Sequence, residues 1–249
     1  MFLLDFFKKK DFKKVLSLDG GGVRALAAVI FLKQLEKETG RSVFDTFDFF
    51  MGVSAGGLNA LHFTINKTSA EKLEDFWTND NLAMSMQKSF WGQAIFLNSK
   101  PKYNNESRTA LLRDYFENKL IAHSDKPVSV LAYDVEKRKP RLISSYDDSN
   151  ISVISAINAT SAAPLYYPTV KIEDGSWLID GGVVANNPSL IGYNEARNYF
   201  KTSNIKVFSI GTGINSKGLD GKSSAEWGPI GWLRNDILGI LSETQYDHE

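Results

Sequence analysis

The chain has 249 residues, no cysteine and 29 basic against 29 acidic side chains, so its formal net charge is zero. With 43% hydrophobic and 12% aromatic residues it has the composition of an ordinary globular protein, which excludes a disordered tail, a collagen-like fibre and a coiled coil. The balanced charge argues against a nucleic-acid partner, because proteins that bind phosphate backbones carry a basic excess. The lack of cysteine excludes thiolate metal sites, a cysteine nucleophile and disulfides.

No apolar run approaches the length of a membrane span. The longest covers residues 25–32, far short of the ~18–20 residues that a span needs. The N-terminus places its apolar residues before its basic ones, the reverse of a secretory signal. We therefore expect a cytoplasmic protein. Residues 1–14 form a separate segment, either a docked terminus or a weak membrane-surface contact through Phe, Leu and Lys side chains.

The apolar residues alternate between short runs and helical spacing along the chain. In residues 24–37 the spacing predicts a helix whose buried side carries Leu26, Val29, Ile30 and Leu35. In chain order, the remaining patterns predict a strand at 15–18, a strand at 49–53, helices at 55–65, 69–76 and 107–120, strands at 128–135 and 141–145, a helix at 151–159, strands at 170–172 and 177–179, a helix at 187–200 and a strand at 206–210.

Two turn signals support this order. Asp174-Gly175 lies between two apolar runs and is typical of a hairpin, and Asn187-Pro188 is typical of a helix start. No repeat or linker divides residues 15–249. Strands that alternate with helices predict the α/β class, as a single three-layer α/β/α domain with a mainly parallel central sheet.

The strongest local motif is Gly52-Val53-Ser54-Ala55-Gly56, which matches G-x-S-x-G between a predicted strand and a predicted helix. In this context the serine occupies a strained turn that exposes its hydroxyl, and the flanking glycines leave room for neighbouring backbone. The helix that follows aims its N–H groups and positive dipole end at the hydroxyl. The motif therefore predicts Ser54 as a nucleophile, against the alternative of an ordinary Gly/Ser turn.

The second motif is the glycine loop Gly20-Gly21-Gly22 at the end of the first predicted strand. Three consecutive glycines leave N–H groups free to converge on an anion. Such a loop serves either as an oxyanion hole beside Ser54 or as a phosphate site, because Gly20-x-Gly22-x-x-Ala25 also fits a dinucleotide-binding pattern. The next predicted strand lacks the acidic residue that usually accompanies that pattern.

A hydrolytic serine needs a base, and the three histidines are poorly placed for that role. His62 falls two turns into the helix after Ser54, His123 lies in a polar loop, and His248 is the penultimate residue. Asp180 follows an apolar run and precedes two glycines, so we expect it at a strand end. Beside Ser54 it would accept the hydroxyl proton directly. The alternative is that Asp180 is a simple turn residue.

Six blocks of the chain together resemble patatin-like phospholipases, in the order found in that family. The resemblance extends from about residue 15 to residue 213. The blocks are Asp19-Gly-Gly-Gly-Val-Arg24, the turn at Ser54, Ser161-Ala-Ala-Pro-Leu-Tyr-Tyr-Pro168, Asp180-Gly-Gly182, Asn186-Asn-Pro188 and Ser209-Ile-Gly-Thr-Gly213.

The resemblance implies a patatin-like fold over residues 15–249 and a lipid acyl hydrolase of phospholipase A type. It implies Ser54 as nucleophile, Asp180 as base and the N–H groups of Gly20, Gly21 and Gly22 as the oxyanion hole, to which we add that of Ala55. Neither a metal ion, calcium included, nor a cofactor is implied. The substrates are membrane phospholipids or related acyl lipids, with peripheral membrane contact; a protein activator is compatible with the sequence, but no pattern identifies one.

Three further residues are candidates for substrate binding. Arg24 either contacts a lipid phosphate or holds the glycine loop, and Tyr166 and Tyr167 either line an acyl pocket or pack beneath the sheet. The chain departs from the family at Ala25, where the family usually has glycine, and in the region 232–249, past which the family usually continues.

Two rival functions remain at this point. One is an α/β-hydrolase-type esterase with a Ser-His-Asp triad, which would use His123 or His248. The other is a non-catalytic module that binds a nucleotide through the glycine loop or binds lipid without cleaving it.

Overall fold

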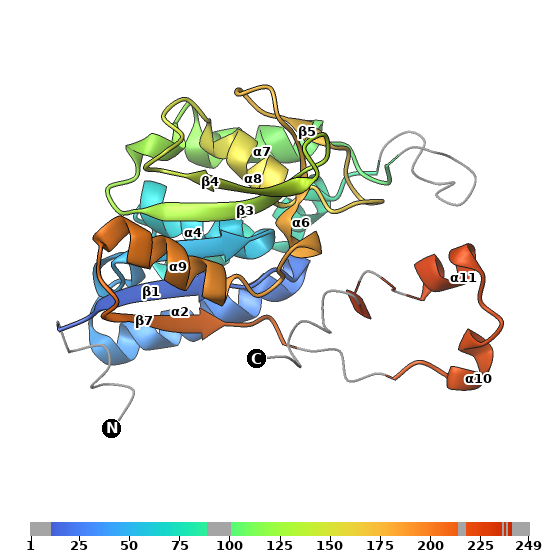
Figure 1. Cartoon of the computed structure of the whole chain (residues 1–249), viewed down its shortest axis with the longest axis horizontal. Coiled ribbons are helices and arrows are strands. Elements are labelled where there is room, and N and C mark those ends of the chain that lie inside the picture. Colours follow the sequence, from blue (N-terminus) through green and yellow to red (C-terminus); the bar gives the residue numbers. More distant parts are fainter. Residues whose placement is uncertain (1–10, 89–100, 214–217, 236, 238, 241–249) are drawn as a thin grey trace.

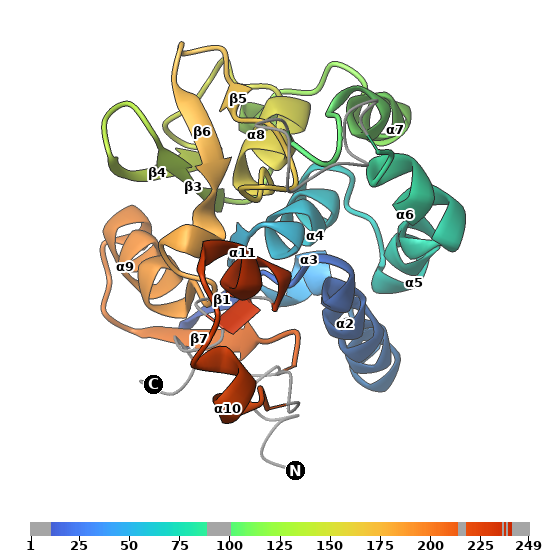
Figure 2. The same cartoon turned by 90° about the vertical axis from the view of Figure 1, so that its right-hand side faces the viewer.

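A computed structural model describes residues 11–88, 101–213, 218–235, 237, 239 and 240. In this part of the chain one seven-stranded sheet lies between helices on its two faces. Figure 2 shows α9 (Ser189–Phe200) on one side of the sheet, with α2 (Leu26–Thr39) and α4 (Ala55–Ile65) on the other. The predicted fold class, a three-layer α/β/α arrangement around a mainly parallel sheet, is confirmed.

The sheet has a parallel part and an antiparallel part (Figure 1). The parallel strands are, in sheet order, β7 (Ile205–Ile210), β1 (Lys13–Leu18), β2 (Phe49–Val53) and β3 (Val128–Asp134). The antiparallel strands are β4 (Lys139–Ser144) and β6 (Trp177–Asp180), which both pair with β3, and β5 (Val170–Lys171), which pairs with β6.

The remaining elements are short helices and two longer ones, α7 and α8, beside β3. In chain order they are η1 (Gly22–Ala25), α3 (Val43–Thr46), α5 (Ala70–Glu74), η2 (Asp75–Trp77), α6 (Asn79–Ser85), α7 (Glu106–Phe116), η4 (Ile121–His123), α8 (Val153–Thr160), η5 (Gly181–Val183), α10 (Gly221–Ser224) and α11 (Pro229–Arg234). Within the described ranges, every helix is too short or too polar to traverse a bilayer.

Both faces of the central strands are buried, which explains their unbroken apolar sequences. Phe50 of β2 packs with Leu16 and Leu18 of β1 in the larger core beneath α2 and α4. Phe49 and Met51, on the opposite face of β2, belong to a smaller core beneath α9. This alternation follows from the two-residue period of a strand.

Two details differ from the sequence prediction. The buried stripe of η1 and α2 is Ala25, Ala28, Val29, Leu32 and Leu35, at spacings of three and four, so Ile30 falls outside it and is 49% exposed. The sheet also begins before residue 15, because Lys13 and Lys14 are the first residues of β1 and Lys14 is buried. Lys14 is therefore not available to a membrane surface, and residues 1–10 lie outside the described part of the chain.

Candidate active site

Ser54 occupies the turn between β2 and α4. Its φ of 55° and ψ of −128° are rare for a residue with a side chain, as expected for a strained nucleophile turn. A Cβ on Gly52 would lie 2.6 Å from the Gly56 carbonyl oxygen, so the two ends of the motif touch through backbone. The glycines of the motif therefore allow the tight turn that the sequence predicted.

The turn at Ser54 is also pressed against the end of β1. A Cβ on Gly56 would lie 2.3 Å from the Leu18 carbonyl oxygen and 2.5 Å from that of Asp19. A Cβ on Gly20 would lie 3.4 Å from Ser54 Cβ, so the glycine loop passes directly beside the serine. Close backbone approach thus brings the two glycine motifs together.

Asp180 meets Ser54 because β2 and β6 lie along the same edge of β3, while β4 covers the other edge. Val53, the last residue of β2, is opposite Leu131, and Asp180, the last residue of β6, is opposite Ala132. The two strands run in opposite directions, so their carboxyl ends meet. The Ser54 hydroxyl donates a hydrogen bond to Asp180 Oδ2 at 2.7 Å.

The Asp180 carboxylate is buried but hydrogen-bonded. Its Oδ1 accepts the Gly182 N–H at 2.7 Å, and a Cβ on Gly181 would lie 2.2 Å from the Leu131 carbonyl oxygen, so the turn after Asp180 needs glycine. Burial raises the pKa of Asp180 to about 6, although the Gly182 and Ser54 hydrogen bonds and the Arg108 charge act in the opposite direction. Asp180 is therefore ionised at neutral pH and more basic than an ordinary aspartate.

Two of the three loop glycines keep their N–H groups available. The Gly20 N–H donates to the Asn186 carbonyl oxygen at 3.0 Å, so it is not free to serve an oxyanion, contrary to the sequence prediction. The Gly20 carbonyl oxygen accepts from Thr212 Oγ1 at 2.8 Å and from Asn186 Nδ2 at 3.3 Å. Among the hydrogen bonds of the described residues, none uses the N–H of Gly21 or Gly22. Gly22 has φ of 56°, which favours glycine.

The segment that begins at Thr160, the last residue of α8, binds the backbone of both Ser54 and Asp180. The Thr160 hydroxyl accepts the Ser54 N–H at 3.0 Å and donates to the Leu131 carbonyl oxygen at 2.5 Å. Two residues further on, the Ala162 carbonyl oxygen accepts the Asp180 N–H at 3.0 Å. The sequence analysis did not identify Thr160, because a threonine at the end of a helix carries no distinctive pattern.

Arg108 of α7 is a second residue that the sequence analysis missed. Its side chain is buried, its guanidinium lies 4.0 Å from the centre of the Tyr167 ring, and its charge acts on Asp180. Tyr167, a predicted substrate-binding residue, is half-buried and donates its hydroxyl to the Ser85 carbonyl oxygen at 3.0 Å. Its ring also lies 5.3 Å from that of Tyr103, between centres, so its side chain contacts Arg108, Tyr103 and α6.

The other predicted substrate-binding residues are exposed. Arg24 lies on η1, directly after the glycine loop. The Tyr166 ring stacks on the Tyr103 ring with 6.2 Å between centres, and Lys102 Nζ lies 5.5 Å above it. Both side chains are thus at the surface of the described part of the protein.

The two histidines in the described part of the chain, His62 and His123, do not contact Ser54 or Asp180. His62 is buried on α4 among Phe76, Tyr115 and Phe116, and burial lowers its pKa to about 3. His123 is exposed, and its Nδ1 accepts the Leu120 N–H at 3.2 Å. His248 lies outside the described residues. Because Ser54 bonds directly to Asp180, the described geometry leaves no imidazole between them.

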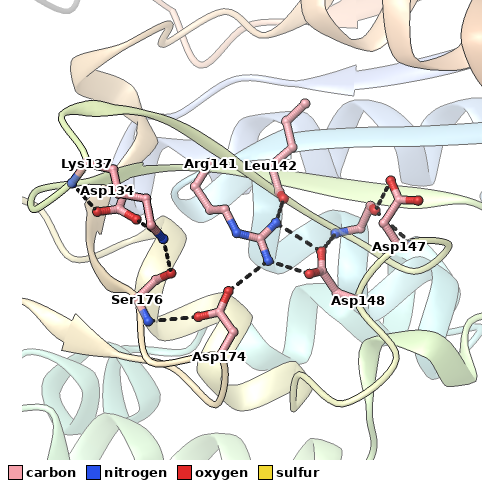
Figure 3. Close-up of polar contacts among 9 residues, drawn as sticks. Asp134, Lys137, Arg141, Leu142, Asp147, Asp148, Asp174 and Ser176 are labelled. Atoms are coloured by element: carbon pink, nitrogen blue, oxygen red, sulfur yellow. Dashed lines mark hydrogen bonds and ion pairs between the residues drawn. The ribbon is translucent and has the colours of Figure 1, made fainter.

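Polar side chains fix the hairpin that carries Asp180 to the outer part of the sheet (Figure 3). Arg141 of β4 forms ion pairs with Asp148 and, at 3.1 Å, with Asp174 in the turn between β5 and β6. The Asp174 side chain also accepts the Ser176 N–H at 2.8 Å, which confirms it as a turn residue. Lys137 donates to Ser176 Oγ at 3.2 Å and pairs with Asp134.

In the described residues no group of three or more His, Asp or Glu side chains is arranged to hold a metal ion.

The chain is similar to a known protein family and to several characterised proteins. The family model of the patatin-like phospholipases matches residues 16–191. Patatin-like protein 2 of Arabidopsis thaliana is 30% identical over 281 residues, covering 94% of this chain and 69% of the relative. The cGAMP-activated phospholipase of Vibrio cholerae is 28% identical over 273 residues, covering 96% of this chain and 76% of the relative.

Among solved structures, VipD from Legionella pneumophila superposes with a TM-score of 0.49 and 13% identity. That match covers 87% of this chain and 52% of VipD, so the chain spans about half the length of that protein. The extent of the family match is decisive: the chain belongs to the patatin-like phospholipase family, whose members are lipid hydrolases.

Proposed function

We propose that the protein is a lipid acyl hydrolase of phospholipase A type, which cleaves fatty-acyl esters of phospholipids or related lipids through Ser54 and Asp180. The observation that carries the proposal is the 2.7 Å hydrogen bond from the Ser54 hydroxyl to Asp180 at a strained strand-to-helix turn. A serine that donates to a buried carboxylate of raised pKa is suited to nucleophilic attack without a histidine.

In the first half-reaction Asp180 accepts the proton of the Ser54 hydroxyl, and Oγ forms a bond to the acyl carbonyl carbon. The carbonyl electron pair moves to oxygen and returns as the bond to the leaving alcohol breaks. The alcohol takes the proton from Asp180, and the acyl group stays on Ser54. Water then attacks the acyl group with Asp180 as base, which releases the fatty acid and restores Ser54.

The oxyanion formed in each step needs hydrogen-bond donors. We assign this role to the N–H groups of Gly21 and Gly22, together with that of Ala55 at the positive end of the α4 dipole. The Gly20 N–H is left out, because it already donates to Asn186. Thr212 and Asn186 instead hold the Gly20 carbonyl oxygen and thereby fix the orientation of the peptide that supplies the Gly21 N–H.

Lipid substrates lie in membranes, so the proposed activity requires peripheral contact with a membrane surface. Arg24 and Tyr166, exposed on segments next to the site, are the candidates for contact with the substrate. A headgroup phosphate suits the Arg24 guanidinium, and an acyl chain suits the Tyr166 ring. The Tyr167 ring contacts the Arg108 guanidinium instead.

The proposal is tested by assaying fatty-acid release from mixed phospholipid vesicles and turnover of a soluble aryl ester. Ser54→Ala and Asp180→Asn are each expected to reduce both activities by about 10³-fold or more, because each removes one member of the proton-transfer pair. Asp220→Asn, which changes an exposed aspartate that also precedes glycine, is the matched control and is expected to stay within about twofold of the wild type. Assays with and without cGAMP test for activation of the kind that the name of one relative describes. Assays with and without EDTA test whether the activity depends on a metal ion.

The rival functions give different results in the same experiments. Replacement of His123 and His248 together abolishes turnover only in a triad esterase; His62 is left in place because it is buried among aromatic rings. A nucleotide-binding module binds nucleotide in calorimetry, and a fluorophosphonate probe fails to label Ser54. A lipid-binding protein binds vesicles and releases no fatty acid.

A further inference from the structure

We propose that Arg108 is a positioning residue for the dyad, whose buried positive charge keeps Asp180 ionised and so sets the pH range in which Ser54 is activated. This inference rests on the proposed function of Ser54 and Asp180. It concerns a residue on α7, a helix that lies outside all six blocks by which the chain resembles its family.

The first observation is that the Arg108 guanidinium is buried entirely among neutral acceptors. Nε donates to Asn158 Oδ1 at 2.9 Å, Nη1 donates to the Ser161 carbonyl oxygen and hydroxyl at 3.1 and 3.2 Å, and Nη2 donates to Asn105 Oδ1 at 2.9 Å. The Tyr167 ring covers the guanidinium at 4.0 Å. The side chain is 6% exposed, and no carboxylate in the described residues forms an ion pair with it.

The second observation concerns the positive charge of Arg108. Burial of a cation without an ion pair costs folding free energy, so the presence of this charge needs an explanation. Lysine and arginine are almost never fully buried unless they are paired. Hydrogen bonds between α7 and α8 alone do not need a charge, because a neutral donor supplies them at lower desolvation cost. Burial lowers the pKa of Arg108, and Tyr167 and then Asp180 act against that lowering, so Asp180 is the carboxylate whose charge acts on Arg108.

The third observation is that Arg108 and the Asp180 backbone bind adjacent residues of one short segment. Arg108 binds the Ser161 carbonyl oxygen, and the carbonyl oxygen of the next residue, Ala162, accepts the Asp180 N–H at 3.0 Å. The same segment begins at Thr160, which accepts the Ser54 N–H. Arg108 is thus fixed relative to both members of the dyad.

The charged and titratable groups around the pair are few. Ser54 and the Gly182 N–H contact the Asp180 carboxylate directly, and Arg108 acts on it through space. Tyr167 faces Arg108, and burial raises the pKa of that phenol, so it stays neutral throughout the range of interest. Burial raises the pKa of Asp180, and the Arg108 charge lowers it, which leaves it at about 6. Without the Arg108 charge the carboxyl group would stay protonated to higher pH and would be a base over a narrower range.

The test is the pH dependence of kcat/KM for a soluble aryl ester between pH 5 and 9 in the full chain. Arg108→Gln removes the charge and keeps polar contacts, whereas Arg108→Lys keeps the charge and loses the forked hydrogen bonds. We expect Arg108→Gln to raise the pKa seen in the acidic part of the profile by about one pH unit, which reduces kcat/KM about fivefold relative to the wild type at pH 6 and hardly changes it at pH 8. Arg108→Lys is expected to show the same acidic pKa of kcat/KM as the wild type. The proposal would be overturned if this pKa were equal in all three proteins, or if both variants raised it by the same amount, because a purely structural role gives those results.

A second variant keeps the proposal testable if Arg108→Gln does not fold. Asn158→Asp places a carboxylate on the Arg108 Nε, neutralises the guanidinium and retains the hydrogen bond. It is also expected to move the acidic limb upward, and an unchanged limb contradicts the proposal. The rate of Ser54 labelling by a fluorophosphonate probe, followed against pH, gives the same midpoints independently of turnover. If Ser54→Ala and Asp180→Asn keep their activity, the proposed function itself fails; if they lose it and the limb stays fixed, only the role of Arg108 fails.

Discussion

The two halves of the candidate site are built in different ways. The half that carries Ser54 is held by backbone packed directly on backbone, where β1, β2 and α4 approach so closely that a single Cβ on Gly52 or Gly56 would collide. The half that carries Asp180 has one such backbone contact, at Gly181, and is otherwise joined to the rest of the molecule by polar side chains. Arg108 donates to the Ser161 carbonyl oxygen, and Arg141 pairs with Asp174 at the hairpin (Figure 3). The contacts of the Ser54 half allow a tight turn within a short segment, whereas those of the Asp180 half join segments that are distant in sequence.

The difference predicts how each half responds to substitution. Backbone cannot rotate away from an added methyl group, so errors in the Ser54 half should reach the whole fold. Side chains can rearrange, and charges can be replaced, so changes in the Asp180 half should act on activity, its pH dependence and moderate amounts of stability.

The largest expected effect is that of Gly56→Ala, where the added Cβ would lie 2.3 Å from the Leu18 carbonyl oxygen. We expect a loss of at least about 3 kcal/mol in the free energy of unfolding, measured by urea denaturation followed by circular dichroism. Gly57→Ala in the same helix is the control, since its Cβ would meet only the Thr160 and Val130 side chains, at 3.0 and 3.2 Å. It is expected to cost less than about 1 kcal/mol, because alanine favours the helix. If Gly56→Ala and Gly57→Ala lost equal free energy of unfolding, backbone contact would not distinguish the Ser54 half from the rest of the site.

The next effect is a gain of stability in Asp180→Asn at neutral and alkaline pH. The pKa of Asp180 rises from 3.8 in the unfolded chain to about 6 in the folded protein, so folding favours the protonated form. The stability from that proton is complete below pH 3.8 and is lost as the pH rises through 6. Asparagine stays neutral, so we expect the variant to exceed the wild type by about 2–3 kcal/mol at pH 8 and to match it near pH 4. A variant less stable than the wild type at pH 8 would contradict this reading of the buried carboxylate.

The smallest effect is that of Arg141→Ala, which removes the ion pairs to Asp148 and Asp174. We expect a loss of about 1–2 kcal/mol, because Asp148 is largely buried and loses its cation. Lys137→Ala removes a more exposed cation, and its partner Asp134 keeps two backbone N–H donors, so less than about 0.5 kcal/mol is expected. Thermal unfolding of the two variants sharpens the comparison, and a greater loss in Lys137→Ala would refute the role given to Arg141.

The same contrast explains what the sequence could predict. Residues 49–65 hold the strand, the turn and the helix of the Ser54 half within one short segment, so the pattern of glycines and apolar residues specifies it almost completely. Strand β6 and the position of Asp180 at its end also follow from a local hairpin pattern. The close pairing of Asp180 with Ser54 follows from the resemblance of ordered blocks, since 126 residues separate the two.

The features that sequence reasoning missed depend on long-range contacts. Arg108 lies in an ordinary amphipathic segment, and its burial comes from α8 and Tyr167, which pack over it. The engagement of the Gly20 N–H depends on where Asn186 lies after β6, which no local pattern reveals. The prediction for Ile30 was wrong for a simpler reason. The buried face of the helix begins at Ala25 and continues through residues 28, 29, 32 and 35, and Ile30 does not lie on that face.

The shared edge of β3 has a consequence for how the protein tolerates insertions and engineering. Val53 pairs with Leu131, and Asp180 pairs with the next residue, Ala132. The distance between Ser54 and Asp180 therefore depends on the spacing of these two residues along β3. A residue inserted between Leu131 and Ala132 would displace Asp180 by about 3.4 Å and reverse the face toward which it points. The turn at residues 136–138 lies outside both pairings, so a segment grafted there would not change this spacing. Such a graft would still have to keep the contacts of Lys137 with Asp134 and Ser176, which fix the hairpin that carries Asp180.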